Sequence, residues 1–215
     1  IFVREDQIAE EVANVIRMIR EVYDVFGLSE PLVYLSTRPE KRLGSDDLWD
    51  RAEAALEHAI KVNDLNYKIN ANDGAFYGPK IDFNVKDAIG RYFQLSTIQL
   101  DYQLPARFKL EYVAQDNSRQ QPVVIHRAVL GSLERFMGIL IEHTAGALPF
   151  WCAPVQAVFV PINDSHVPFC AAAAEKMRAA GLRVQVDDSN ASMGAKTREA
   201  QTQKIPYMLA VGDRE

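Results

Sequence analysis

Two stretches near the start of the chain have the apolar spacing of an amphipathic helix. Within residues 5–26 the apolar positions recur at steps of three and four, apart from one adjacent pair: Ile8, Val12, Val15, Ile16, Ile19, Val22 and Phe26. Gly27 follows, so the pattern predicts a helix that ends at a glycine. A second stripe runs from Ser45, a favoured N-cap residue type, to about Val62. Each stripe must pack on another layer, because burying one such side chain is worth about 1.5–3 kcal/mol.

Strand-like segments follow one another up to residue 130. They cover residues 32–36, 67–70, 80–86, 91–100, 108–114 and 123–130. Residues 80–86 alternate apolar and polar side chains, and the turn at residues 87–90 predicts a long antiparallel hairpin with the next segment. Several successive strands flanked by helices indicate an α+β domain with an antiparallel sheet.

After residue 153 the pattern changes to a strict alternation. Strands are predicted at residues 155–162, 182–187 and 206–212, with helices at residues 165–180 and 193–204 between them. Alternation of this kind predicts a parallel sheet. We therefore expect two domains, residues 1–153 and residues 154–215. The second domain is small, and the chain starts at Ile1 rather than Met, so we expect it to be part of a longer protein.

Composition narrows the class of protein. The 215 residues are 48% hydrophobic and carry a formal net charge of -5, which argues against a generally basic nucleic-acid-binding surface. Cys152 and Cys170 form no CxxC pair, which fits a reducing compartment. The sequence contains no apolar run of 18 residues and no signal-peptide pattern, so we expect a cytoplasmic protein without a membrane segment.

The candidate chemistry lies in residues 122–140. His126 sits in an apolar strand, Gly131 and Ser132 break that strand, and Arg135 occupies the first turn of the following helix. At about 3.3 Å per strand residue, His126 is at most about 17 Å from the turn. The small residues permit a planar ligand close to the backbone, and an arginine there can bind phosphate or stack on a base. Read without relatives, Arg135 could equally pair with Glu134 or Glu142, and His126 could be a core residue with a satisfied hydrogen bond.

Four long segments carry a resemblance to a known family. They are LSTRPEKRLGSDDLWDRAE at residues 35–53, GAFYGPKIDF at 74–83, TIQLDYQLP at 97–105 and VIHRAVLGSLERFMGIL at 124–140. Together they resemble the threonyl-tRNA synthetases, which are class II aminoacyl-tRNA synthetases, and the likeness runs end to end. The resemblance implies part of a class II catalytic sheet, with motif 3 present and motif 1 and most of motif 2 absent, followed by part of an anticodon-binding domain.

The resemblance also implies roles for individual residues. Arg135 matches the motif 3 arginine that lies over the adenine of ATP and helps to hold its phosphates, with Gly131 and Ser132 giving close backbone approach. The residues implied to line the threonine and ATP pocket are Tyr77, Gln94, Thr97 and Gln99, with Lys80 a contact to the tRNA end or the nucleotide. Strand parity lets Thr97 and Gln99 share a face, whereas Gln94 would point the opposite way unless a bulge intervenes.

His126 matches one of three zinc ligands of the family, and the matching cysteine and second histidine precede this segment. The resemblance therefore implies that the complete protein binds Zn²⁺ through His126, while this chain alone does not hold it tightly. Zinc that binds the substrate hydroxyl would reject valine, because a site built to bind a hydroxyl discriminates strongly against an analogue that lacks it.

The implied reaction joins threonine to ATP as threonyl-adenylate and then to tRNA(Thr), with Mg²⁺ bridging the phosphates. The complete protein is expected to be a homodimer, and the isolated chain to be inactive. For tRNA, the second domain offers Asn190 before a helix and Arg198 on it, with Lys196 and Lys204 nearby. Two alternatives stay open: a non-catalytic class II paralogue, and a simple RNA-binding accessory fragment.

Overall fold

A six-stranded sheet forms the centre of the first part of the chain in the computed structural model, which describes residues 1–28 and 31–213. The strand order is β1-β8-β5-β4-β2-β3. The strands are β1 Phe2–Val3, β2 Leu32–Ser36, β3 Tyr67–Asn70, β4 Lys80–Lys86, β5 Tyr92–Asp101 and β8 Val123–Ala128. The β2–β3 pair is parallel and the others are antiparallel, so the predicted α+β class and antiparallel character are confirmed.

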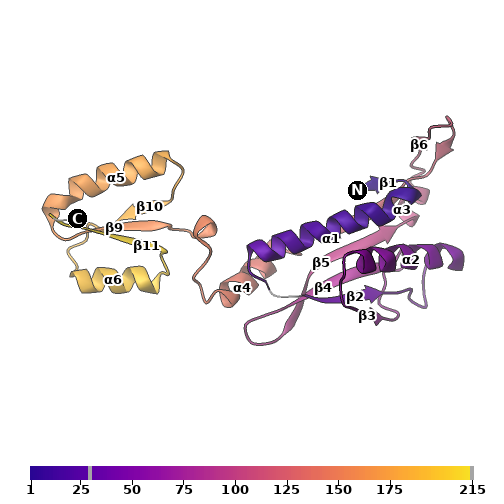
Figure 1. Ribbon diagram of the computed structural model, residues 1–215, viewed down its shortest axis with the longest axis horizontal. Coiled ribbons are helices and arrows are strands. Elements are labelled where there is room, and N and C mark those ends of the chain that lie inside the picture. Colours follow the sequence, from indigo (N-terminus) through magenta and orange to yellow (C-terminus); the bar gives the residue numbers. More distant parts are fainter. Residues whose placement is uncertain (29–30, 214–215) are drawn as a thin grey trace. The chain divides into compact units, whose positions relative to one another are not determined.

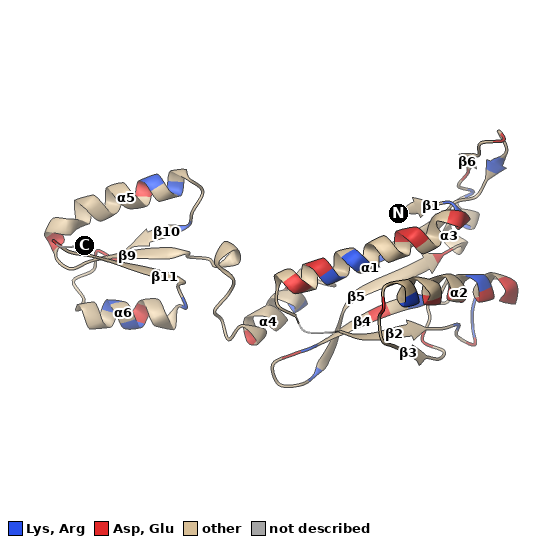
Figure 2. Ribbon diagram, in the orientation of Figure 1, with Lys and Arg blue, Asp and Glu red and all other residues tan. Residues whose placement is uncertain are grey.

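Two long helices pack with this sheet (Figure 1). A short 3-10 turn, Glu5–Gln7, leads into α1 Ile8–Val25, and α2 is Asp46–Val62. Gly27 ends the first helix with φ of +64°: its N–H donates to the Asp24 carbonyl and the Leu28 N–H donates to Tyr23. Ser45 caps α2 by accepting the Leu48 N–H at 3.3 Å. Charged residues of both signs are spread along α1 and α2, as Figure 2 shows.

The hairpin between β4 and β5 closes on Asp87. This buried carboxylate accepts the backbone N–H groups of Ile89 at 3.1 Å and Arg91 at 2.7 Å, and the Arg91 Nε at 2.6 Å. Burial opposes the charge of Asp87, but the bonds from Arg91 outweigh it and hold the pKa of this carboxyl below its ordinary value of 3.8. The predicted turn at residues 87–90 is therefore a charge-stabilised turn.

One predicted strand is mostly wrong. Residues 108–114 were expected to be extended, but α3 Gln103–Arg107 precedes them and Phe108 ends that helix. The Asp101 carboxylate accepts the N–H groups of Gln103 at 2.8 Å and Leu104 at 3.0 Å, which starts a short helix there. Within the predicted segment β6 covers only Tyr112–Val113, paired with β7 Arg119–Gln120.

The two compact units of the chain are Ile1–Met137 and Gly138–Glu215, and they divide within α4 Leu133–His143. The second unit holds β9 Ala157–Pro161 between β10 Val184–Val186 and β11 Tyr207–Val211, all parallel as predicted. Its helices are α5 Val167–Ala179 and α6 Met193–Thr202. One 3-10 turn, Phe150–Cys152, precedes β9, and another, Asp164–His166, leads into α5. The domain boundary expected near residue 153 stays a prediction.

The helices of the second unit cover opposite faces of its sheet. Ala157 and Phe159 pack with Cys170 of α5, whereas Val158 and Val160 pack with Ala200 of α6. Alternate residues of one strand point to opposite faces, so β9 is buried on both sides. Over the residues that the structure describes, no helix combines the length and apolar content needed to cross a bilayer.

Candidate active site

Strand register gathers the predicted pocket residues on one face of the large sheet. Lys80 pairs with Gln99, Asp82 with Thr97, and Gln99 with His126. Directly paired residues point to the same face, so strands β4, β5 and β8 present these side chains together. The intervening residues Ile81, Phe83, Ile98, Leu100 and Ile125 point the other way and are buried. One face of this sheet is therefore apolar core and the other is a polar surface.

Asp82 is the centre of that polar surface. It is only 4% exposed, and its Oδ2 accepts Ser36 Oγ at 3.0 Å and lies 2.9 Å from Lys80 Nζ. Its Oδ1 accepts Thr97 Oγ1 at 2.9 Å and Gln94 Nε2 at 2.5 Å. Burial of the Lys80 ammonium disfavours its charge, yet the carboxylates of Asp82 and Asp73 outweigh that effect and raise the pKa of Lys80. Sequence reasoning missed Asp82, because it reads as one polar position in an alternating strand.

Gln94 joins this surface through a bulge. Ser96 pairs with Phe83 and Gln94 with Asn84, so Leu95 is an extra residue without a partner in β4. The extra residue restores Gln94 to the face that carries Thr97, and both side chains reach Asp82. A bulge is the condition under which strand parity places Gln94 with Thr97, and the structure contains that bulge.

Tyr77 reaches the same surface from the turn before β4. Its hydroxyl donates to Gln99 Oε1, and Gln99 Nε2 donates to Thr97 Oγ1 at 3.4 Å. Burial raises the pKa of Tyr77, and the charge of Asp101 adds to the rise. The turn sits close to β5 because Gly78 has no side chain: a Cβ there would lie 1.7 Å from the Leu100 carbonyl oxygen.

His126 lies beside this cluster and bonds to a buried carboxylate. Its Nε2 is 2.9 Å from Asp101 Oδ2, and its ring centroid is 6.0 Å from that of Tyr77. Among the residues that the structure describes, no three His, Cys, Asp or Glu side chains are arranged to hold a metal ion. The described part of the chain thus does not provide the three protein ligands that a catalytic zinc site uses.

The small-residue turn and its arginine follow β8. Gly131 adopts φ of +63°, and a Cβ there would be 3.0 Å from the Leu95 carbonyl oxygen, so the turn packs against the bulge of β5. Ser132 Oγ accepts the Arg135 N–H at 3.2 Å. The Arg135 side chain is exposed and forms no hydrogen bond or ion pair with another described residue, so the alternative pairing with Glu134 or Glu142 is not seen.

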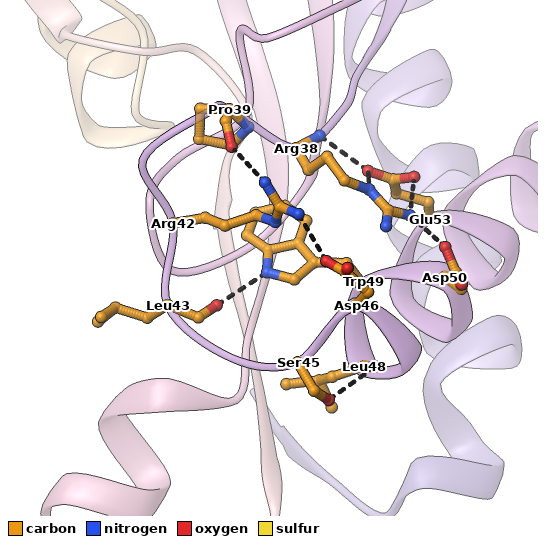
Figure 3. Close-up of polar contacts among 10 residues, drawn as sticks. All are labelled: Arg38, Pro39, Arg42, Leu43, Ser45, Asp46, Leu48, Trp49, Asp50 and Glu53. Carbon is orange, nitrogen blue, oxygen red and sulfur yellow. Dashed lines mark hydrogen bonds and ion pairs between the residues drawn. The ribbon is translucent and has the colours of Figure 1, made fainter.

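Two arginines of the first family-like segment, Arg38 and Arg42, are paired with residues of their own loop and of α2. Figure 3 shows Arg38 bonded to Glu53 and Asp50, with Arg38 Nη2 2.7 Å from Glu53 Oε2. Arg42 donates to the Pro39 carbonyl at 3.1 Å and pairs with Asp46 at 2.5 Å. These contacts tie the loop between β2 and α2 to the start of α2, and we assign it a structural role.

The predicted tRNA residues lie at the surface of the second unit. Asn190 and Arg198 are both exposed, before and on α6. Lys196 was grouped with them, but it is buried and its Nζ donates to the Asp187 carbonyl at 2.8 Å. Lys196 is therefore not a free cation. It lines a cavity of about 430 Å³ between α6 and β10.

The chain is similar to named proteins over its whole length. Residues 1–144 match the tRNA synthetase class II core domain (G, H, P, S and T), and residues 156–215 match an anticodon binding domain. Threonine–tRNA ligase 2 of Bacillus subtilis is 52% identical and the threonine–tRNA ligase of Thiobacillus denitrificans is 51% identical, each over 215 residues. The match covers 100% of this chain and 34% of each relative, so the chain spans about a third of their length.

Two solved structures of threonyl-tRNA synthetases are also similar to the chain. The RNA binding domain of threonyl-tRNA synthetase from Cryptosporidium parvum superposes with a TM-score of 0.93 at 40% identity, covering 100% of this chain and 54% of that one. A putative threonyl-tRNA synthetase from Aeropyrum pernix gives 0.84 at 27% identity, with 98% and 51% covered. The chain therefore belongs to the class II tRNA synthetase family, with a core segment followed by an anticodon-binding segment.

Proposed function

We propose that the chain is part of a threonine–tRNA ligase, which activates threonine with ATP and transfers it to tRNA(Thr). The observation that carries the proposal is the polar face of the sheet. There Thr97 donates to the buried Asp82, Gln99 donates to Thr97, and Tyr77 donates to Gln99. Relatives that carry the name threonine–tRNA ligase support the choice of amino acid. We further propose that residues 1–153 and 154–215 are the partial catalytic and anticodon-binding domains.

The chemistry needs positioning more than it needs a reactive side chain. Threonine carboxylate attacks the α-phosphate of ATP, pyrophosphate leaves, and the terminal adenosine of tRNA then takes the threonyl group. Amides and hydroxyls of Gln94, Thr97 and Gln99 would orient the amino acid, and Lys80 would face the nucleotide or the tRNA end. The exposed guanidinium of Arg135 would stack on adenine, with Gly131 and Ser132 beside it. Mg²⁺ bound to ATP would neutralise phosphate charge.

Zinc stays part of the proposal only for the complete protein. His126 would supply one ligand, and the described residues lack two more. Metal analysis of the isolated chain is expected to find no firmly bound zinc, and one tightly held zinc per chain would contradict this view. For the complete protein we propose a cytoplasmic homodimer.

Threonine-dependent exchange of pyrophosphate into ATP by the complete protein tests the proposed function. Activity with threonine, and much weaker activity with valine, is expected. A protein that binds tRNA but neither binds ATP nor exchanges pyrophosphate would instead be an RNA-binding accessory protein. A protein that shows neither tRNA binding nor pyrophosphate exchange would instead be a non-catalytic paralogue.

A further inference from the structure

We propose that Tyr23 and Ser96 are positioning residues for ATP, because they hold the backbone at Val129. Neither side chain would touch the nucleotide. Both would act through residues 129–136, the nucleotide segment, which carries Ser132 and Arg135. The inference rests on the proposed function and deepens it, since it assigns how the fold fixes the place of the adenine ring.

Ser96 is a polar residue on the apolar face of the large sheet. It pairs with Phe83 across β4 and β5, and both residues are fully buried. A buried hydroxyl costs free energy unless it is hydrogen-bonded. Ser96 Oγ donates to the Val129 carbonyl, and it lies 2.5 Å from the hydroxyl oxygen of Tyr23 on α1. These bonds lie on the opposite side of the sheet from Asp82, so they belong to a separate network.

The two bonds have a fixed direction. A carbonyl oxygen only accepts, so the single proton of the Ser96 hydroxyl points at Val129. The Tyr23 hydroxyl therefore donates to the Ser96 oxygen. Burial raises the pKa of Tyr23 to about 12, so the phenol keeps this proton at neutral pH. The bond from Tyr23 occupies the Ser96 oxygen and keeps the Ser96 proton directed at Val129.

Val129 is the point where the strand gives way to the turn. Strand β8 ends at Ala128, and Gly131 then adopts φ of +63° and packs against the bulge of β5. Ser132 Oγ accepts the Arg135 N–H at 3.2 Å and so starts α4. The position of the Val129 carbonyl therefore sets where the turn begins, and with it the position of the Arg135 guanidinium.

The last turn of α1 also contacts the far end of the nucleotide segment. The ring of Phe26 meets the ring of Phe136 edge to face, with centroids 4.8 Å apart. Phe136 is buried and directly follows Arg135 in α4. Tyr23 and Phe26 are three positions apart, so they lie on one face of the helix end. The end of α1, which lies beside α4 in Figure 1, thus supports the segment at both of its ends.

Pyrophosphate exchange by the complete protein tests the inference. Ser96→Ala removes the donor and leaves the Val129 carbonyl buried without it, so the turn is expected to move toward another donor. The KM for ATP should rise about fivefold or more, whereas the KM for threonine should change by less than about twofold. The threonine side chains keep their places, because Thr97 still donates to Asp82 on the other face of the sheet.

Ile16→Val is the matched control for stability. Ile16 is fully buried on α1, two turns before Tyr23, and its shortening destabilises the same helix by an amount comparable to one lost hydrogen bond. Both KM values should stay at wild-type levels in this variant. If Ile16→Val raised the KM for ATP as much as Ser96→Ala, loss of helix stability would explain the effect and the inference would be overturned.

A double-mutant cycle tests whether Tyr23 acts through Ser96. Tyr23→Phe keeps the ring and removes only the outer bond, so it should raise the KM for ATP by about two- to threefold. In the Ser96→Ala background the same change should add almost nothing. An undiminished effect in that background would contradict the proposed order of the bonds. Tyr23→Phe also carries the test alone where Ser96→Ala does not fold, and a wild-type KM for ATP in it would then overturn the inference.

The result for wild type separates this inference from the proposed function. If wild type exchanges pyrophosphate with threonine and Ser96→Ala has the wild-type KM for ATP, the positioning role is refuted and the proposed function stands. Equal rises in the KM for ATP and for threonine would also refute it, because a general loss of structure would then be the cause. Absence of exchange in wild type would overturn the proposed function, and this inference with it.

Discussion

Gly78→Ala should damage both the fold and the candidate site of the complete protein. Gly78 lies in the turn that carries Tyr77, and an added Cβ would be 1.7 Å from the Leu100 carbonyl oxygen and 2.8 Å from its carbon. Both atoms belong to backbone, so no side chain can move aside. Real Cβ contacts of less than 3.0 Å are essentially never seen, and the turn must therefore move by more than an ångström.

The movement has two costs. It breaks the bond in which the Leu100 N–H donates to the Pro79 carbonyl at 3.2 Å, and it opens a packed region. Overpacking of this kind and one lost backbone bond together should lower the free energy of unfolding by about 3 kcal/mol. The same shift moves Tyr77, and a misplacement of about 1 Å in a site can reduce the rate by about a hundredfold.

Urea unfolding and threonine-dependent pyrophosphate exchange measure these two effects separately. Gly138→Ala is the control, because its added Cβ has no heavy atom within 4 Å and the residue lies inside α4. The control should be neutral or more stable by up to about 1 kcal/mol. A Gly78→Ala protein with the stability and exchange rate of wild type would refute the argument from close approach.

Three further outcomes are expected. The stability that Asp87 contributes is present above its ordinary pKa of 3.8 and is lost as pH falls through its lower folded pKa. The difference in free energy of unfolding between wild type and Asp87→Asn, measured by urea unfolding, should therefore shrink between about pH 5 and pH 2. Ser45→Ala should reduce the free energy of unfolding by about 1 kcal/mol, and Ser45→Gly by only a few tenths. The double variant Asn190→Ala with Arg198→Ala should weaken tRNA binding in filter assays without changing pyrophosphate exchange. The control Lys176→Ala on α5 should leave tRNA binding and exchange unchanged. Equal weakening of tRNA binding by Lys176→Ala would indicate nonspecific charge attraction.

Local sequence signals predicted the elements whose cause is local. The stripe of the first helix and the glycine at its end, the cap at Ser45, and the alternation of residues 80–86 each depend on neighbours within a few residues, and each is confirmed. The parallel pairing of the strands in the second unit followed from the strict alternation of strands and helices. Such patterns need no knowledge of distant contacts.

The remaining features depend on residues far apart in sequence. Asp101 starts a short helix where a strand was expected, and it also holds His126, which is 25 positions away. The sequence does not indicate that Asp82 is the centre of the polar surface, because its hydrogen-bond and ion-pair partners come from three strands, β2, β4 and β5. The sequence suggests that Lys196 is a free cation, but its long side chain reaches the backbone carbonyl of Asp187 and donates to it.

In the proposed function, the polar face of the large sheet holds the amino acid of the activated intermediate. A crystal structure of the complete protein with a non-hydrolysable threonyl-adenylate analogue tests it most directly. We expect the threonyl group to lie against Tyr77, Thr97 and Gln99 and the adenine ring to lie against the Arg135 guanidinium. An analogue bound away from Tyr77, Thr97 and Gln99 would contradict the account.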